Sequence, residues 1–153
     1  MPALLNHIDP NGLEEFSVVF TDRSLNHMSK EFQKVMCDLS SNLKEVYNAN
    51  AVVLVPGGGT FAMEAVARQF GNDASVLVIR NGWFSYRWSQ IFESSASARE
   101  TTVVKARMVG NESISPFMPA DVSDVVEKIK TDKPTIVFAP HVETSDGVFL
   151  PDD

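Results

Sequence analysis

Apolar positions in this chain follow two patterns that alternate along it. Compact runs rich in β-branched and aliphatic residues, typical of buried strands, occupy residues 51–55, 75–80, 100–107 and 135–139. Apolar residues recur every three or four positions, as on one face of a helix, over residues 26–47, 60–70, 83–92 and 120–130. We therefore predict an α/β protein with a mainly parallel sheet and right-handed crossovers.

The first apolar run leads into three consecutive glycines, Gly57, Gly58 and Gly59, and Thr60 adds a hydroxyl at the start of the next helix. Glycines let the backbone turn sharply and lie close to a ligand that a Cβ would obstruct. The first turn of a helix offers unpaired N–H groups and the positive end of the helix dipole to an anion. This strand–turn–helix pattern favours a phosphate site, although a glycine-rich turn without a ligand remains an alternative.

Two further polar segments, at residues 80–88 and 140–147, follow predicted strands. Like the segment at residues 56–60, each contains glycine and lies at the carboxyl end of its strand. In parallel α/β sheets, ligands bind beyond the carboxyl ends of the strands. We therefore expect these three segments to form the functional face. The segment at residues 80–88 also holds four aromatic residues, for which packing is the alternative to ligand binding: Trp83, Phe84, Tyr86 and Trp88.

Composition narrows the class of protein. The chain has 153 residues and a net charge of -7, which argues against nucleic acid or an anionic membrane surface as the main partner. It lacks an apolar run near the ~20 residues of a membrane span and the features of a signal peptide, so we expect no membrane partner. With a single cysteine it cannot form an internal disulfide, so we expect a cytoplasmic protein. The single cysteine, Cys37, is expected to pack in its helix, and no histidines share a metal-ligand spacing.

Residues 1–22 show little periodicity, so we interpret them as an extended N-terminal arm, and residues 23–153 as the α/β domain. An arm of this kind needs a surface to lie on, and a partner subunit is one candidate. The helix over residues 26–47 has Asn26 or Ser29 as its expected N-cap, and the helix over residues 120–130 has Asp121 or Ser123.

Four segments together resemble the pyridoxal-phosphate-dependent aminotransferases of class V, fold type I, in particular the alanine–glyoxylate and serine–pyruvate branch. They are residues 27–30 (HMSK), 57–65 (GGGTFAMEA), 81–88 (NGWFSYRW) and 141–147 (HVETSDG). Each segment is short, and the resemblance rests on their order and spacing along nearly the whole chain. It implies a three-layer α/β/α large domain that binds pyridoxal 5'-phosphate, a homodimer, and amino acid and 2-oxo acid substrates.

The resemblance also implies roles for individual residues. Gly58, Gly59 and Thr60 would hold the cofactor phosphate. Phe84 falls where the family stacks an aromatic ring on the pyridine face, although Trp83 is adjacent and the register allows either. Thr144 falls where the family has a hydroxyl near the cofactor ring oxygen, with turn stabilisation as its alternative role. His141 and Glu143 belong to the same loop and are expected to shape it.

No lysine of this chain matches the family's Schiff-base lysine, and the aspartate that pairs with the pyridine nitrogen is also missing. The resemblance therefore covers an N-terminal portion of the large domain. We expect a truncated chain that has no catalytic residue and cannot transaminate alone.

Two alternative functions remain open. Gly57, Gly59 and Ala62 fit a relaxed dinucleotide fingerprint, with Arg80 available for a 2′-phosphate of NADP. A short paralogue that acts only as a binding module is the other.

Overall fold

The computed structural model describes residues 27–149, and the chain divides into two compact units, residues 1–54 and 55–153. The predicted arm at residues 1–22 lies outside the described residues. Within the described part of the first unit, helix α1 (Lys30–Val46) confirms the predicted helix. Its N-cap is Ser29, whose hydroxyl accepts the Phe32 N–H at 3.0 Å. No helix among residues 27–149 is long and apolar enough to span a bilayer.

Two expectations for the first unit are wrong. Residues 51–55 form no strand, and the Val53 side chain is 82% exposed. A strand needs a neighbour to pair with, and no strand of the described residues pairs with this segment. Cys37 is exposed rather than packed, because α1 buries none of its own side chains.

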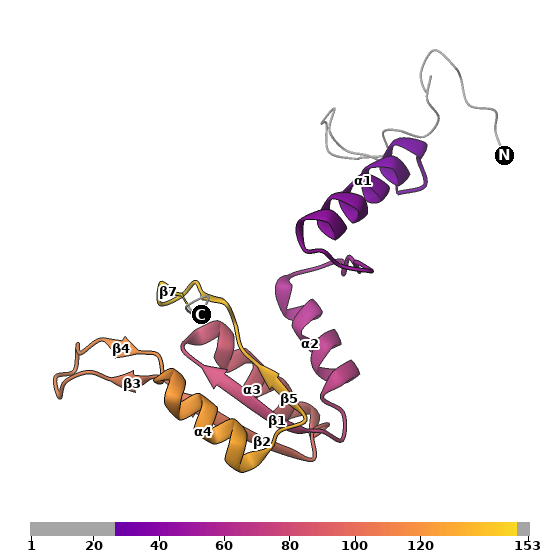
Figure 1. Cartoon of the computed structure of the whole chain (residues 1–153). Helices are drawn as coiled ribbons and strands as arrows, with labels where there is room; N and C mark the ends of the chain where they lie inside the picture. Colours follow the sequence, from indigo (N-terminus) through magenta and orange to yellow (C-terminus); the bar gives the residue numbers. More distant parts are fainter. Residues whose placement is uncertain (1–26, 150–153) are drawn as a thin grey trace. The chain divides into compact units, whose positions relative to one another are not determined.

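The second unit contains the predicted parallel sheet (Figure 1). Strands β1 (Ser75–Arg80), β2 (Glu100–Lys105) and β5 (Ile136–Phe138) run parallel in the order β2-β1-β5. Val78 of the central strand stands opposite Val103 on one side and Phe138 on the other. The α/β class with a parallel sheet is thereby confirmed.

The described part of this unit, residues 55–149, contains three helices: α2 (Gly59–Phe70), α3 (Trp83–Ser95) and α4 (Val122–Asp132). Helix α2 packs on α3, and α3 packs on β1 and β2. The core between them is formed by the buried residues Ala67, Ala74, Val76, Val78, Ile91, Phe92 and Phe138. Leu77, which points to the opposite face of β1, is also fully buried. The central strand is therefore covered on both faces, as parallel sheets require.

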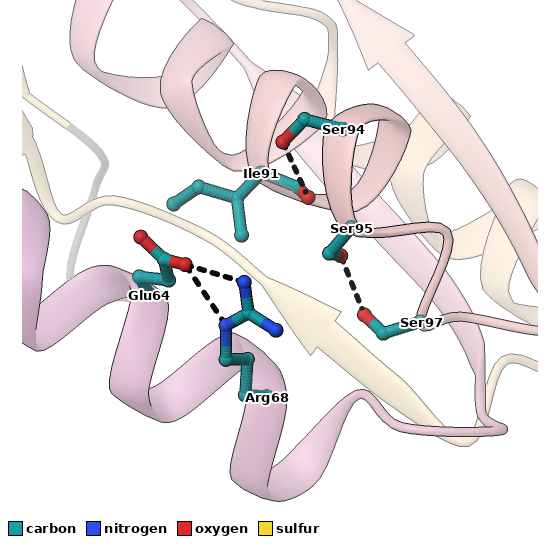
Figure 2. Close-up of polar contacts among 6 residues, drawn as sticks. All are labelled: Glu64, Arg68, Ile91, Ser94, Ser95 and Ser97. Carbon is teal, nitrogen blue, oxygen red and sulfur yellow. Dashed lines mark hydrogen bonds and ion pairs between the residues drawn. The ribbon is translucent and has the colours of Figure 1, made fainter.

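Figure 2 shows polar contacts on two of these helices. On α2, the Arg68 guanidinium pairs with Glu64, with Nε at 2.8 Å from Oε1. Helix α3 ends at Ala96, which has a left-handed backbone with φ of 47°. The hydroxyls of Ser95 and Ser97 lie 2.8 Å apart across that residue. The contact between Ser95 and Ser97 therefore lies at the carboxyl-terminal end of α3.

Two small antiparallel hairpins complete the unit. Strand β3 (Arg107–Met108) pairs with β4 (Phe117–Met118), and β6 (Val142–Glu143) pairs with β7 (Val148–Phe149). The third predicted strand is thus divided into β2 and β3, and part of the predicted loop at residues 111–119 is the strand β4. Asp121 is the N-cap of α4, but its carboxylate accepts from Arg107 at 2.7 Å rather than from the helix.

Candidate functional site at the carboxyl ends of the strands

The structure brings two of the three predicted segments into direct contact at the start of α3. Glu143, from β6, is only 1% exposed and reaches the first turn of the helix. Its Oε1 accepts the Phe84 N–H at 2.9 Å, and its Oε2 accepts the Ser85 N–H at 2.8 Å. The hydroxyl of Ser145 accepts the Trp83 N–H at 3.2 Å. The N–H groups that a helix leaves unpaired in its first turn are therefore all occupied here.

Ser85 links this carboxylate to the turn after β1. Its hydroxyl lies 2.5 Å from Glu143 Oε2, and it also accepts the N–H groups of Asn81 at 2.8 Å and Gly82 at 2.9 Å. Ser85 is fully buried. The arrangement is half of a capping box, because the N-cap residue Gly82 has no side chain and the carboxylate of Glu143 takes its place.

Position 82 requires a glycine because a side chain would not fit there. A Cβ built at this position would lie 1.6 Å from Asp146 Oδ2 and 2.6 Å from Glu143 Cγ. The backbone of Gly82 is extended, with φ of -179°, so its conformation is open to any residue. Only the absence of a side chain lets the loop at residues 140–147 approach the helix.

The ionisation of Glu143 follows from these contacts. Burial raises the pKa of its carboxyl, but the hydrogen bonds from Ser85, Phe84 and Ser145 outweigh that effect and lower the pKa below its ordinary value of 4.5. Glu143 is therefore a carboxylate at neutral pH, next to the positive end of the α3 dipole. The start of α3 already holds an anion that belongs to the protein.

The start of α2 differs. Its N-cap is Gly58, which provides no side-chain hydrogen bond. The N–H groups of Gly59 and Thr60 have no partner among the described residues, and all three residues are exposed. A Cβ at Gly58 or Gly59 would meet nothing within 4 Å, so the space in front of this helix end is open.

A groove of about 520 Å³ lies between α2, α3 and the end of β5. Its lining includes Met63 and Val66 from α2, Phe84 and Trp88 from α3, and the segment 136–142. Of the site residues predicted from sequence, Phe84 lines this groove, as does His141 of the predicted loop. Gly58, Gly59, Thr60 and Thr144 do not line it, and Thr144 is exposed in the turn between β6 and β7.

The aromatic residues divide into two groups. Trp83 and Phe84 are 58% and 47% exposed, so core packing does not account for either ring. Trp88 instead packs on the core residue Phe138, with ring centroids 4.6 Å apart. The guanidinium of Arg80 lies over the ring of Tyr86, with its Cζ 5.1 Å from the ring centroid. Of the two exposed rings only Phe84 lines the groove.

Sequence reasoning placed Glu143 in a shaping loop but missed Ser85 and the contact between them. One local signal was available: Gly82 directly precedes the helix and has no acceptor of its own, and Ser85 stands at the third helical position. That pairing indicates a capping box whose other half must come from elsewhere in the chain.

Comparison with known proteins supports a relationship to one class of enzyme. No family model matches the chain. The chain is 28% identical over 134 residues to an alanine–glyoxylate aminotransferase of Rattus norvegicus. The match covers 86% of this chain and 30% of that relative, so the chain spans less than a third of the relative's length. The protein described here is thus an α/β protein with distant similarity to an aminotransferase.

Proposed function

We propose that this chain forms the phosphate- and ring-binding part of a pyridoxal-phosphate-dependent aminotransferase of class V, fold type I. The observation that carries the proposal is the 28% identity to an alanine–glyoxylate aminotransferase across 86% of the chain. The reaction is the exchange of an amino group between an amino acid and a 2-oxo acid. The chemistry that pyridoxal 5'-phosphate supplies when bound is an electron sink for that exchange.

The residues present suit such a cofactor. Gly58, Gly59 and Thr60 offer unpaired N–H groups and a hydroxyl at the positive end of α2, which favours a phosphate. Phe84 offers an exposed ring on the wall of the groove, as a flat heteroaromatic ligand requires. We assign the phosphate to the α2 terminus and the stacking contact to Phe84 rather than Trp83.

Glu143 prepares this site without touching the ligand. By accepting the N–H groups of Phe84 and Ser85 it fixes the backbone that carries the Phe84 ring. Thr144 directly follows Glu143 in the chain, and we propose that its hydroxyl pairs with the ring oxygen.

No lysine among the described residues lines the groove. We propose that this chain alone holds the cofactor without a covalent bond and does not transaminate. We further propose that the working protein is a cytoplasmic homodimer, that residues 1–22 are an N-terminal arm, and that residues 23–153 belong to the large domain.

The dinucleotide-binding alternative is less well supported. Its fingerprint requires a strand directly before the glycines, and residues 51–55 form none.

The experiment is a titration of the purified chain with pyridoxal 5'-phosphate, followed by quenching of tryptophan fluorescence. We expect saturable binding that weakens about tenfold in Phe84→Leu, for the loss of one stacking contact, and much less in the matched control Trp83→Leu. Borohydride treatment followed by intact-mass measurement should show no covalent adduct. Binding of NADPH with no response to pyridoxal 5'-phosphate would support the dinucleotide alternative, and binding of neither would support an interaction module.

A further inference from the structure

A second pocket, separate from the groove, lies at the carboxyl ends of β1 and β2. Its volume is about 290 Å³, close to the lower limit for small-molecule sites. It shares no lining residue with the groove. Its charged lining residues are Arg80, Lys105 and Asp146, and Phe117 contributes an aromatic ring. The function proposed above assigns no role to this pocket.

Arg80 is the cation that the fold holds in place. It is the last residue of β1 and is half-buried. Its guanidinium lies over the Tyr86 ring, and its side chain forms no hydrogen bond or ion pair with another described residue. The ring attracts the charge but offers no oxygen acceptor. The N–H donors of Arg80 therefore stay available to a ligand.

Lys105 adds a second positive charge at the same place. It is the register partner of Arg80 and ends the neighbouring strand β2, so the two side chains lie on the same face of the sheet. Lys105 is exposed and also forms no ion pair with a described residue. Two neighbouring cations repel each other, and an anion between them would replace this repulsion with attraction.

Asp146 lines the same pocket but neutralises neither cation. It forms no ion pair with Arg80 or Lys105. Its Oδ2 instead lies 2.8 Å from the hydroxyl of Ser145. The lining thus carries two positive charges and one negative charge, which leaves one positive charge in excess, in a chain whose own net charge is -7. A ligand with one negative charge would balance the pocket.

We propose that this pocket binds a small monocarboxylate with a short apolar body. The carboxylate lies between Arg80 and Lys105, because an arginine fork and an ammonium both bind carboxylate oxygens. The apolar body packs on the ring of Phe117, which is 59% exposed. This proposal does not depend on the aminotransferase function.

The test is a titration of the full chain with butyrate, butyramide and acetate, in a buffer that contains neither phosphate nor another carboxylate. Binding is followed by the backbone NMR signals of residues 80–82, 105–106 and 117. We expect butyrate to shift these signals saturably. Butyramide, which has a similar shape without the charge, should bind about tenfold more weakly. Acetate should bind about fivefold more weakly than butyrate, because it lacks two methylene groups that contact Phe117.

Four outcomes of this titration would overturn the proposal. Equal affinity for butyrate and butyramide would show that the charge is not recognised, and equal affinity for butyrate and acetate would show the same for the apolar body. Tighter binding of inorganic phosphate than of butyrate, in a parallel titration, would mean a phosphate site. Shifts confined to residues 58–61 would place the anion at the start of α2.

Charge variants locate the carboxylate. Arg80→Gln should weaken butyrate binding about tenfold, and Lys105→Gln, at an exposed residue, about threefold. Lys130→Gln is the matched control: it makes the same charge change on an exposed residue of α4 and should leave the affinity unchanged. Asp146→Asn should tighten binding, because it removes the negative charge from the lining. Equal losses in Arg80→Gln and Lys130→Gln would show that only the net charge of the chain matters, and would overturn the proposal.

Phe117→Ser tests the apolar contact separately. The variant should bind butyrate and acetate with equal affinity, and its affinity for acetate should match that of the unaltered chain. Because the ring is largely exposed, the substitution should leave the fold intact. A preference for butyrate that survives in this variant would overturn the proposed contact with Phe117 and with it the orientation of the ligand.

Discussion

Helices α2 and α3 both begin at a glycine, yet their first turns are in opposite states. At α3 the carboxylate of Glu143 and the hydroxyl of Ser145 accept the N–H groups of Trp83, Phe84 and Ser85. At α2 the N–H groups of Gly59 and Thr60 meet no described residue. Gly82 is crowded by two carboxylates, whereas Gly58 and Gly59 face open space.

The comparison shows that a glycine before a helix has two different uses. At Gly82 it admits a side chain from elsewhere in the chain, and the helix end becomes part of the framework. At Gly58 it leaves the helix end free for an external anion. A search for phosphate sites from glycines alone would rank the two helices together, and only the distant carboxylate separates them.

The largest expected difference in stability is between two variants that each add one methyl group at a helix start. Gly82→Ala should destabilise the chain by about 3 kcal/mol, because its Cβ overlaps Asp146 and Glu143. Gly59→Ala, the matched control, should change stability by less than about 1 kcal/mol, because its Cβ meets no atom. The measurement is urea unfolding followed by fluorescence, since both tryptophans lie in α3. Equal effects of the two variants would contradict the comparison.

Removing the charge of Glu143 at the start of α3 should have the next largest effect on the free energy of unfolding. Glu143→Gln keeps the shape but turns an amide NH₂ toward one of the helix donors, so we expect a loss of about 2 kcal/mol. Thr144→Val, at the exposed neighbouring position, should cost less than about 0.5 kcal/mol. The same unfolding measurement applies. A Glu143→Gln variant as stable as the parent would show that the carboxylate does not stabilise the helix start.

These effects also show what the sequence could and could not predict. The strand at Ser75–Arg80 was predicted correctly, and Ser29 was one of the two residues predicted to cap α1. A buried apolar run and a hydroxyl before a helix are both local signals. The strand predicted at residues 51–55 is wrong, because side-chain pattern does not reveal whether a neighbouring strand exists. The Glu143–Ser85 contact was missed for a related reason: its two residues are 58 positions apart.

The contact of Glu143 with α3 should make the free energy of unfolding depend on pH. The pKa of Glu143 is lowered in the folded chain from its ordinary value of 4.5. Its contribution to stability is therefore full above that ordinary value, which applies to the unfolded chain, and is lost as the pH falls through the lowered folded value. Urea unfolding measured between about pH 3 and about pH 6, a range that brackets the ordinary pKa of a glutamate, should show this loss of stability. In Glu143→Gln the acid-side decline should be smaller. An identical decline in both proteins would mean that other carboxylates cause it.

The smallest change in stability should come from giving α2 a cap of its own. Gly58→Ser places a hydroxyl where the backbone is extended and space is free, so we expect a gain of a few tenths of a kcal/mol, roughly 0.3. The same hydroxyl would occupy an N–H group that we assign to the phosphate, and affinity for pyridoxal 5'-phosphate should fall. Unfolding and ligand titration of one sample check both outcomes. Unchanged affinity would place the phosphate elsewhere.

The long separation between Ser85 and Glu143 has a consequence for the order in which this chain folds. As the chain is synthesised, α3 is complete long before the residue that caps it, so its first turn has only the hydroxyl of Ser85 to rely on. Contacts across such a distance form late because closing the intervening loop costs entropy. Pulse-labelling hydrogen exchange during refolding should therefore show the amides of Phe84 and Ser85 becoming protected after those in the later turns of α3.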